Sequence, residues 1–206
     1  MPRFVGRENV RKRLAPLQGE PGRTTYADGE VRIDSAGELI VVRPPFGLAH
    51  EGSYETVELG PLFEALAEDH VVAALLVRLG GFAVGVFEGE RLVVSKVGSR
   101  FVKGRHKKGG SSANRFRRRR QEQERALIEA AADTAAQVLE PWRDRVEFAA
   151  LGGDRRAASQ VVDDQRLAWL HERALPRFFT TTDPRFRTLE RLPYDLYAAE
   201  TTEGAY

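Results

Sequence analysis

The alternation of apolar and polar positions is clearest after Pro61, where a short helix is predicted over Leu62–Glu68. Three strand-like runs follow it, at His70–Leu79, Phe82–Glu88 and Arg91–Val97. The turns between them, Gly80-Gly81 and Glu88-Gly89-Glu90, have the length of β-hairpin turns. We therefore expect three antiparallel strands that are neighbours in one sheet.

Helical spacing of apolar and small residues continues from Asn114 to Glu140, and Pro141 ends it. The residues that share this helical face are Phe116, Leu127, Ala131, Ala135, Val138 and Leu139. A strand is predicted next, at Val146–Leu151. Helical sequence follows from the N-cap Asp154 to about Glu172, with an interruption near Asp163-Asp164. The last predicted elements are a strand at Ala174–Thr181 and a helix at Pro184–Leu192. This order predicts an α/β fold with a ribonuclease H-like mixed sheet covered by helices.

The chain before Gly60 follows a different pattern. Residues 4–17 predict a short helix, and the runs Glu30–Asp34 and Glu38–Arg43 predict a hairpin with Ser35-Ala36-Gly37 as its turn. Pro44-Pro45 then begins a loop-rich segment. We expect a small α+β extension or cap over residues 1–60 and the α/β domain over residues 61–206.

Composition narrows the class of protein. A hydrophobic fraction of 42% with 30% charged residues in 206 residues suits a globular protein. Cysteine is absent, which excludes disulfides and thiolate metal sites, and the four histidines lack metal-ligand spacing. The longest apolar run, Val71–Val77, is strand-sized, and the N-terminus lacks the apolar centre of a signal peptide. We expect a cytoplasmic protein without membrane association and without a metal or small-molecule cofactor.

Basic residues are concentrated between Arg91 and Gln121, a stretch that contains neither Asp nor Glu. It holds 12 of the 32 lysines and arginines, so the rest of the chain carries 20 basic against 30 acidic residues, a balance of −10. Charge segregated in this way points to a polyanionic partner, which for a soluble protein is most often nucleic acid.

A glycine-rich basic loop, Gly104–Asn114, joins a predicted strand to the predicted long helix. Glycine pairs let a backbone approach another molecule closely, and Lys and Arg neutralise phosphates without reading sequence. A solvated surface loop explains this composition equally well. However, Arg115 and Arg117–Arg120 crowd the first turns of the helix, where the macrodipole disfavours cations and attracts phosphate. Their placement favours an RNA partner.

The string Lys103–Arg120, KGRHKKGGSSANRFRRRR, resembles the catalytic loop and following helix of Vms-like release factors of the actinobacterial branch. The likeness extends to the three preceding strands, to Leu151–Arg155 and to Phe178–Arg187. These proteins share a domain with the middle domain of eukaryotic and archaeal class-one release factors. The resemblance implies that residues 61–206 form a release-factor-like catalytic domain, which hydrolyses peptidyl-tRNA and frees nascent chains from stalled ribosomes.

The resemblance also implies a site and its partners. A loop tip of Gly109, Gly110, Ser112, Ala113 and Asn114 is expected to position the attacking water. A monomer is expected to bind large-subunit RNA and peptidyl-tRNA through Arg105, His106, Lys107, Lys108, Arg115, Arg117, Arg118, Arg119 and Arg120. The family carries a Gln after its glycines, whereas this chain has Ala113 there, or Ser112 if the loop is aligned one residue shorter. Asn114 is the nearest amide, although its position favours a helix cap.

Other interpretations are also open. The missing Gln fits a non-catalytic ribosome- or tRNA-binding protein of translation quality control. A metal-dependent nuclease needs clustered carboxylates, which the strand His70–Leu79 lacks. Ser112 and His106 have no orienting carboxylate beside them, which disfavours a nucleophile and base. Asp154 and Arg155 are candidate tRNA or ribosome contacts, with a helix cap as the favoured role of Asp154.

Overall fold

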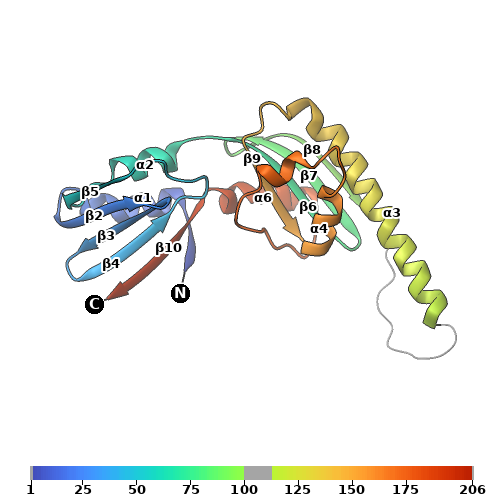
Figure 1. Cartoon of the computed structure of the whole chain (residues 1–206), viewed down its shortest axis with the longest axis horizontal. Coiled ribbons are helices and arrows are strands. Elements are labelled where there is room, and N and C mark those ends of the chain that lie inside the picture. Colours follow the sequence, from blue (N-terminus) through green and yellow to red (C-terminus); the bar gives the residue numbers. More distant parts are fainter. Residues whose placement is uncertain (1, 100–112, 206) are drawn as a thin grey trace. The chain divides into compact units, whose positions relative to one another are not determined.

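A six-stranded antiparallel sheet is built from both ends of the chain (Figure 1). The computed structural model describes residues 2–99 and 113–205. The sheet has the order β1-β10-β4-β3-β2-β5. Its strands are β1 (Arg3–Gly6), β2 (Pro21–Ala27), β3 (Glu30–Ser35), β4 (Glu38–Arg43), β5 (Gly52–Thr56) and β10 (Ala198–Ala205). Because β10 pairs with both β1 and β4, the last residues of the chain complete the sheet that the first residues begin.

Two helices cover one face of this sheet. α1 (Arg7–Leu14), which continues into the short helix η1 (Ala15–Leu17), and α2 (Gly60–Ala67) contribute Val10, Leu14, Leu62 and Leu66 to the core. The inward positions of β3 are apolar and alternate with polar ones, because successive side chains of a strand point to opposite faces. β4 buries Ile40 and Val42 on the same inward face, while its outward positions Leu39 and Val41 are also apolar. On the other face, Glu30 accepts hydrogen bonds from Arg32 and Arg43 at 2.8 and 2.6 Å.

The second sheet is mixed and has the order β8-β7-β6-β9. Its strands are β6 (Val71–Arg78), β7 (Gly81–Glu88), β8 (Arg91–Ser99) and β9 (Phe148–Gly153). β7 pairs antiparallel with both β6 and β8, and β9 pairs parallel with β6. The central strands β6 and β7 are buried over almost their whole length, which is expected of strands covered on both faces.

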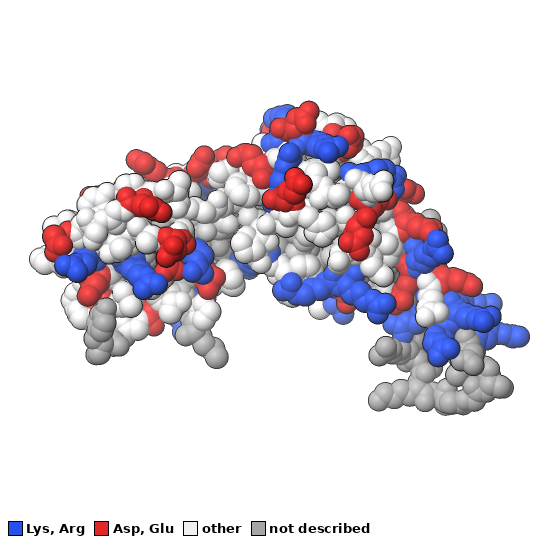
Figure 2. All heavy atoms as spheres, viewed as in Figure 1, with Lys and Arg blue, Asp and Glu red and all other residues white. Residues whose placement is uncertain are grey.

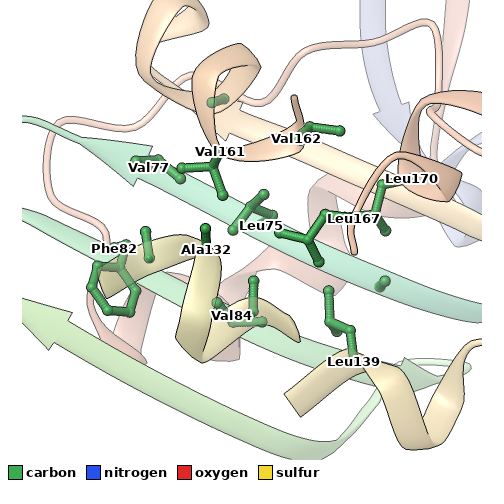
Figure 3. Close-up of a cluster of buried hydrophobic side chains, with 14 of the residues drawn as sticks. Leu75, Val77, Phe82, Val84, Ala132, Leu139, Val161, Val162, Leu167 and Leu170 are labelled. Atoms are coloured by element: carbon green, nitrogen blue, oxygen red, sulfur yellow. The ribbon is translucent and has the colours of Figure 1, made fainter. Parts of the chain in front are cut away.

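Helices cover this sheet. α3 (Ala113–Leu139) and α4 (Arg155–Val162) pack together on one face, where apolar side chains of α3, α4, β6 and β7 meet in a single cluster (Figure 3). α6 (Phe186–Leu196) lies against the opposite face, where a Cβ added to Gly85 would stand 3.5 Å from Leu189. Two short helices, η2 (Glu140–Trp142) and α5 (Trp169–Glu172), complete the set of named elements.

The strand directions give this sheet two distinct ends. β8 runs parallel to β6 because both are antiparallel to β7, and β9 is parallel to β6 as well. Arg78, Ser99 and Gly153 therefore finish their strands at one end, which we call the carboxyl end. Val71, Arg91 and Phe148 begin theirs at the other, which we call the amino end.

The chain forms two compact units, one of Met1–Asp69 with Pro193–Tyr206 and one of His70–Leu192. The sequence pattern predicts a boundary after residue 60, with residues 61–206 in the second domain. The structure differs at both ends of that domain. α2 buries Leu62 and Leu66 in the core of the first sheet, and β10 forms two ladders there.

Several elements predicted from sequence are confirmed by the structure. They are the three strands β6, β7 and β8, the long helix α3, the hairpin of β3 and β4, and the helix α4, which Asp154 caps. The chain is a mixed α/β protein with one antiparallel and one mixed sheet. The finer assignment to a ribonuclease H-like topology stays a prediction.

Other local predictions are wrong. Ala174–Thr181 is not a strand, since only Ala174 and Phe179 form isolated bridges to β9, and Pro176 between them has no N–H to donate. Residues 3–6 form β1 where a helix was expected from residue 4. β2, β5 and β10 were not predicted, because their sequences are short, polar or rich in small residues. Such strands form through pairing rather than through their own apolar pattern.

Candidate nucleic-acid interface

The predicted catalytic loop falls between β8 and α3. Most of its residues lie outside the described part of the chain, namely Arg105, His106, Lys107, Lys108, Gly109, Gly110 and Ser112. The helix begins at Ala113, so Ala113 and Asn114 both belong to its first turn. Asn114 is therefore inside the helix and not in the capping position before it, which corrects the expected cap.

The first half of α3 carries exposed arginines, and none of its described side chains belongs to the buried core. Arg115, Arg117, Arg118 and Arg119 are exposed, and Arg120 is partly buried with its Nε 3.7 Å from Glu124 Oε1. The core residues of α3 begin only at Leu127, which leaves about 20 Å of helix before it. Figure 2 shows Lys and Arg side chains gathered over this part of the helix. The structure thus presents five of the nine predicted RNA-binding residues on one projecting element.

These arginines are unfavourable for the helix itself. The first turn of α3 contains no acidic residue, although the positive end of a helix macrodipole favours Asp or Glu there. Packing does not explain Arg115 or Arg117–Arg119 either, since these side chains are exposed to solvent. Their arrangement supplies fixed positive charge of the kind that phosphate groups neutralise.

At the carboxyl end of the sheet, the chain after β9 is fixed by a cap and by a neighbouring segment. Asp154 accepts a hydrogen bond from the Ala157 N–H at 2.9 Å, so its predicted capping role is confirmed. The Phe179 N–H donates to the Leu151 carbonyl at 2.9 Å, and the Gly153 N–H donates to the Phe179 carbonyl at the same distance. Residues 177–181 therefore lie directly beside the end of β9.

Gly152 and Gly153 permit this close approach. A Cβ on Gly152 would lie 2.2 Å from the Phe179 carbonyl oxygen, and one on Gly153 would lie 2.0 Å from the Val77 carbonyl oxygen. Gly153 also has a φ of +94°, which side chains rarely tolerate. Arg155, the other candidate contact in this region, is exposed with its guanidinium carbon 4.4 Å from the centre of the Phe178 ring. Arg78, Arg156 and Arg177 lie at the same end and were not singled out by the sequence analysis.

The amino end of the same sheet has internally paired charges. Glu88 accepts hydrogen bonds from Arg91 at 2.5 Å and from Arg145 at 2.6 Å. The hydrogen bond from Arg145 is the main cause that holds the pKa of Glu88 below its usual value. Burial acts to raise the pKa of Glu147, but hydrogen bonds from His70 and from the Val71 N–H outweigh it, so this pKa is also lowered.

Among residues 2–99 and 113–205, no three His, Asp or Glu side chains gather closely enough to hold a metal ion. Within the same described ranges, no helix is both long enough and apolar enough to cross a bilayer. The site described by the structure is therefore a set of arginine side chains and the helix and sheet ends that hold them.

A family comparison decides what kind of protein carries this surface. The family described as "Actinobacteria/chloroflexi VLRF1 release factor" matches residues 70–202, more than half of the chain. The chain belongs to this release factor family. The resemblance noted from Lys103–Arg120 is thereby confirmed.

More distant relatives were also found. The "Peptide chain release factor subunit 1" of Archaeoglobus fulgidus is 28% identical over 109 residues, which cover 53% of this chain and 27% of that protein. The crystal structure of the archaeal translation termination factor aRF1 aligns with a TM-score of 0.48 and 14% identity over 77% of this chain and 50% of that one. The Vms1 mitochondrial localization core aligns with a TM-score of 0.47 and 13% identity over 94% and 80%. This chain thus spans about a quarter of its archaeal sequence relative.

Proposed function

We propose that this release factor family member binds the large ribosomal subunit as a monomer and hydrolyses peptidyl-tRNA, freeing nascent chains from stalled ribosomes. The observation that carries the proposal is the family match over residues 70–202, which spans the whole unit that bears the loop and the arginines of α3. The exposed Arg115 and Arg117–Arg119 support it, since RNA is the polyanion of the ribosome and of tRNA.

The reaction asks for little covalent chemistry from the protein. A water oxygen attacks the ester carbonyl carbon, the bond to the terminal ribose oxygen breaks, and that oxygen leaves with one proton of the water while the other passes to solvent. The products are a free peptide carboxylate and a tRNA hydroxyl. Under this proposal Gly109 and Gly110 bring backbone N–H groups to the ester, where they orient the water and stabilise the oxyanion. Arg105, His106, Lys107 and Lys108 bind the surrounding RNA.

Ala113 raises a second candidate function. The family has a Gln at this position, and Ala113 offers neither a donor nor an acceptor in its side chain. A chain without this amide can keep its RNA contacts and lose hydrolysis. The second candidate is therefore a non-catalytic ribosome- or tRNA-binding protein. In the first candidate, the loop backbone, with Ser112 or Asn114, replaces the missing amide.

One experiment separates the two. Purified full-length chain is added to stalled ribosome complexes that carry labelled nascent peptide, and peptide release is followed over time beside Gly110→Ala and Ala113→Gln variants. Gly204→Ala serves as the matched control, because a Cβ there meets no described atom within 4 Å. Release by the wild type that Gly110→Ala abolishes and Gly204→Ala preserves supports hydrolysis through the loop backbone. Release by Ala113→Gln alone supports the non-catalytic binding protein. If no variant releases peptide and none sediments with ribosomes, both candidates are rejected.

A further inference from the structure

Four arginines gather at the carboxyl end of the second sheet, apart from the arginines of α3. Arg78 ends β6, Arg155 and Arg156 begin α4 directly after β9, and Arg177 belongs to the segment beside β9. Figure 2 shows Lys and Arg side chains spread along this edge of the unit. We call Arg78, Arg155, Arg156 and Arg177 the carboxyl-end arginine surface. β8, which the predicted loop follows in the sequence, finishes at this same end of the sheet, with β7 between it and β6.

Residues 177–181 hold three of these arginines in place. Arg78 donates a hydrogen bond to the Thr181 carbonyl at 3.1 Å, and Arg155 stacks on the Phe178 ring with its guanidinium carbon 4.4 Å from the ring centre. The guanidinium carbon of Arg177 lies 5.0 Å from the centre of the Phe179 ring. Such contacts restrict long side chains without neutralising them, so less conformational entropy is lost when a ligand binds.

Three of the four charges of this surface are not balanced by an ion pair among the described residues. Arg78, Arg155 and Arg156 form no ion pair in the described part of the chain, and all three are exposed. Asp154, which precedes Arg155 in sequence, caps α4, and Asp183 pairs with Arg185 at 2.8 Å. The first turn of α4 contains no acidic residue, so Arg155 and Arg156 face the unfavourable end of its macrodipole.

We propose that the carboxyl-end arginine surface binds the phosphate backbone of RNA beside the site that the loop engages. The proposal rests on the proposed function for the identity of that RNA, and on the surface itself for the chemistry. Planar guanidinium groups fixed by stacking keep their N–H forks open to phosphate oxygens, which accept paired hydrogen bonds from them. A surface of arginines without a reading pocket fits a contact that positions RNA without selecting its sequence.

The amino end of the sheet offers a matched control. Arg145 stacks on Trp142 at 4.7 Å, as Arg155 does on Phe178, but it also pairs with Glu88. Arg143 stands near it, 50% exposed and 3.8 Å from Glu140. The double variants Arg155→Ala/Arg156→Ala and Arg143→Ala/Arg145→Ala therefore remove the same charge and the same kind of stacking from opposite ends.

The probe is a fluorescein-labelled RNA hairpin with a single-stranded 3′ end, and its binding to the full chain is measured by anisotropy between about 50 and 200 mM salt. We expect Arg155→Ala/Arg156→Ala to weaken binding about tenfold and to lower the slope of log affinity against log salt by about 1.5 to 2. We expect Arg143→Ala/Arg145→Ala to stay within about twofold of the wild type. Thermal melts check that each variant is folded, and Arg155→Gln/Arg156→Gln replaces the alanine variant if that one is not.

The proposal is overturned if both double variants lose affinity equally, if neither does, or if the wild type binds the hairpin without salt dependence. Displacement of the hairpin by polyglutamate at equal charge concentration assigns the surface to an acidic polypeptide and overturns it as well. Failure of peptide release by the wild type and by Ala113→Gln rejects hydrolysis but leaves the hairpin result standing. Equal hairpin affinities of the wild type and Arg155→Ala/Arg156→Ala reject RNA binding by this surface but leave hydrolysis standing. The two failures are therefore distinguishable.

Discussion

The two ends of the second sheet carry similar arginines in different electrostatic surroundings. At the amino end, Arg145 stacks on Trp142 and donates to Glu88, which also accepts a hydrogen bond from Arg91. At the carboxyl end, Arg155 stacks on Phe178 and forms no ion pair among the described residues. Both arginines rest on an aromatic ring, so stacking alone does not distinguish the two ends. The difference lies in the carboxylate.

The comparison separates charge that serves the fold from charge that is left for a ligand. A carboxylate that accepts from two arginines lowers the electrostatic cost of gathering them, and it leaves little attraction for an external anion. Arginines at a helix start without an acidic partner do the opposite, since they raise the cost of the folded state and keep their attraction for phosphate. A surface of that second kind is expected where ligand binding, and not the stability of the fold, accounts for the arginines.

The largest effect is expected from the glycine that shapes the carboxyl end. Gly152→Ala places a methyl group 2.2 Å from the Phe179 carbonyl oxygen and 2.6 Å from Leu76 Cδ2, so backbone must move. We expect the free energy of unfolding to fall by about 2 kcal/mol and hairpin affinity to fall with it, because Phe178 and Thr181 no longer hold Arg155 and Arg78. Chemical denaturation and anisotropy measure the two effects.

Gly204→Ala is the control for this change, since open space surrounds that position and alanine is compatible with its strand. It should alter neither stability nor hairpin affinity beyond error. A Gly152→Ala variant with wild-type stability would show that residues 177–181 are not held against β9 as described.

The next effect concerns the cap at the same end. Asp154→Ala removes the acceptor of the Ala157 N–H, and we expect it to cost about 1 kcal/mol of unfolding free energy. Asp154→Asn keeps an acceptor of the same shape and removes a negative charge beside Arg155. Stability should then change by only a few tenths of a kcal/mol, while hairpin binding becomes tighter. Equal losses of stability in both variants, measured by denaturation, would contradict the capping role.

Much of this molecule could be predicted from local sequence pattern. Alternation and short glycine turns predicted β6, β7 and β8, and helical spacing from Leu127 onward predicted α3. β10 could not be predicted, because Ala198–Ala205 has no apolar alternation and becomes a strand only through its ladders with β1 and β4. The part of β10 in the first sheet was missed for the same reason, since the end of the chain returns to a sheet formed by its beginning.

The candidate site was predictable only where its residues are consecutive. The run Arg117–Arg120 is visible in sequence, whereas Arg78 and Arg177 are 99 residues apart and reach the same end of the sheet only through the fold. Nothing in the sequence tells which arginines have carboxylate partners. Arg145 pairs with Glu88 across the fold, while Arg155 forms no ion pair among the described residues, although it follows Asp154, whose carboxylate caps the helix.

A smaller effect is expected when the carboxyl end is given a carboxylate of its own. Gln160 is exposed four residues after Arg156, so Gln160→Glu offers this arginine an ion pair on the surface of α4. We expect roughly threefold weaker hairpin binding with unchanged stability, because the added charge competes with phosphate. Gln137→Glu, an identical change at an exposed position near the end of α3, should leave binding unchanged. Equal weakening by both would mean that net charge, and not pairing, sets the affinity.

The smallest effect tests the paired end by titration. The pKa of Glu88 lies below its ordinary value of 4.5 because Arg145 and Arg91 stabilise the carboxylate. A group with a lowered folded pKa stabilises the protein above its unfolded pKa, and this contribution is lost as pH falls through the folded pKa. In the Arg145→Ala variant the pKa of Glu88 should therefore rise, which an NMR titration measures. The free energy of unfolding should also fall less steeply below pH 4.5 in this variant than in the wild type. Arg155→Ala should leave that pKa unchanged, and a rise of similar size in both variants would mean that the two ends of the sheet are not electrostatically separate.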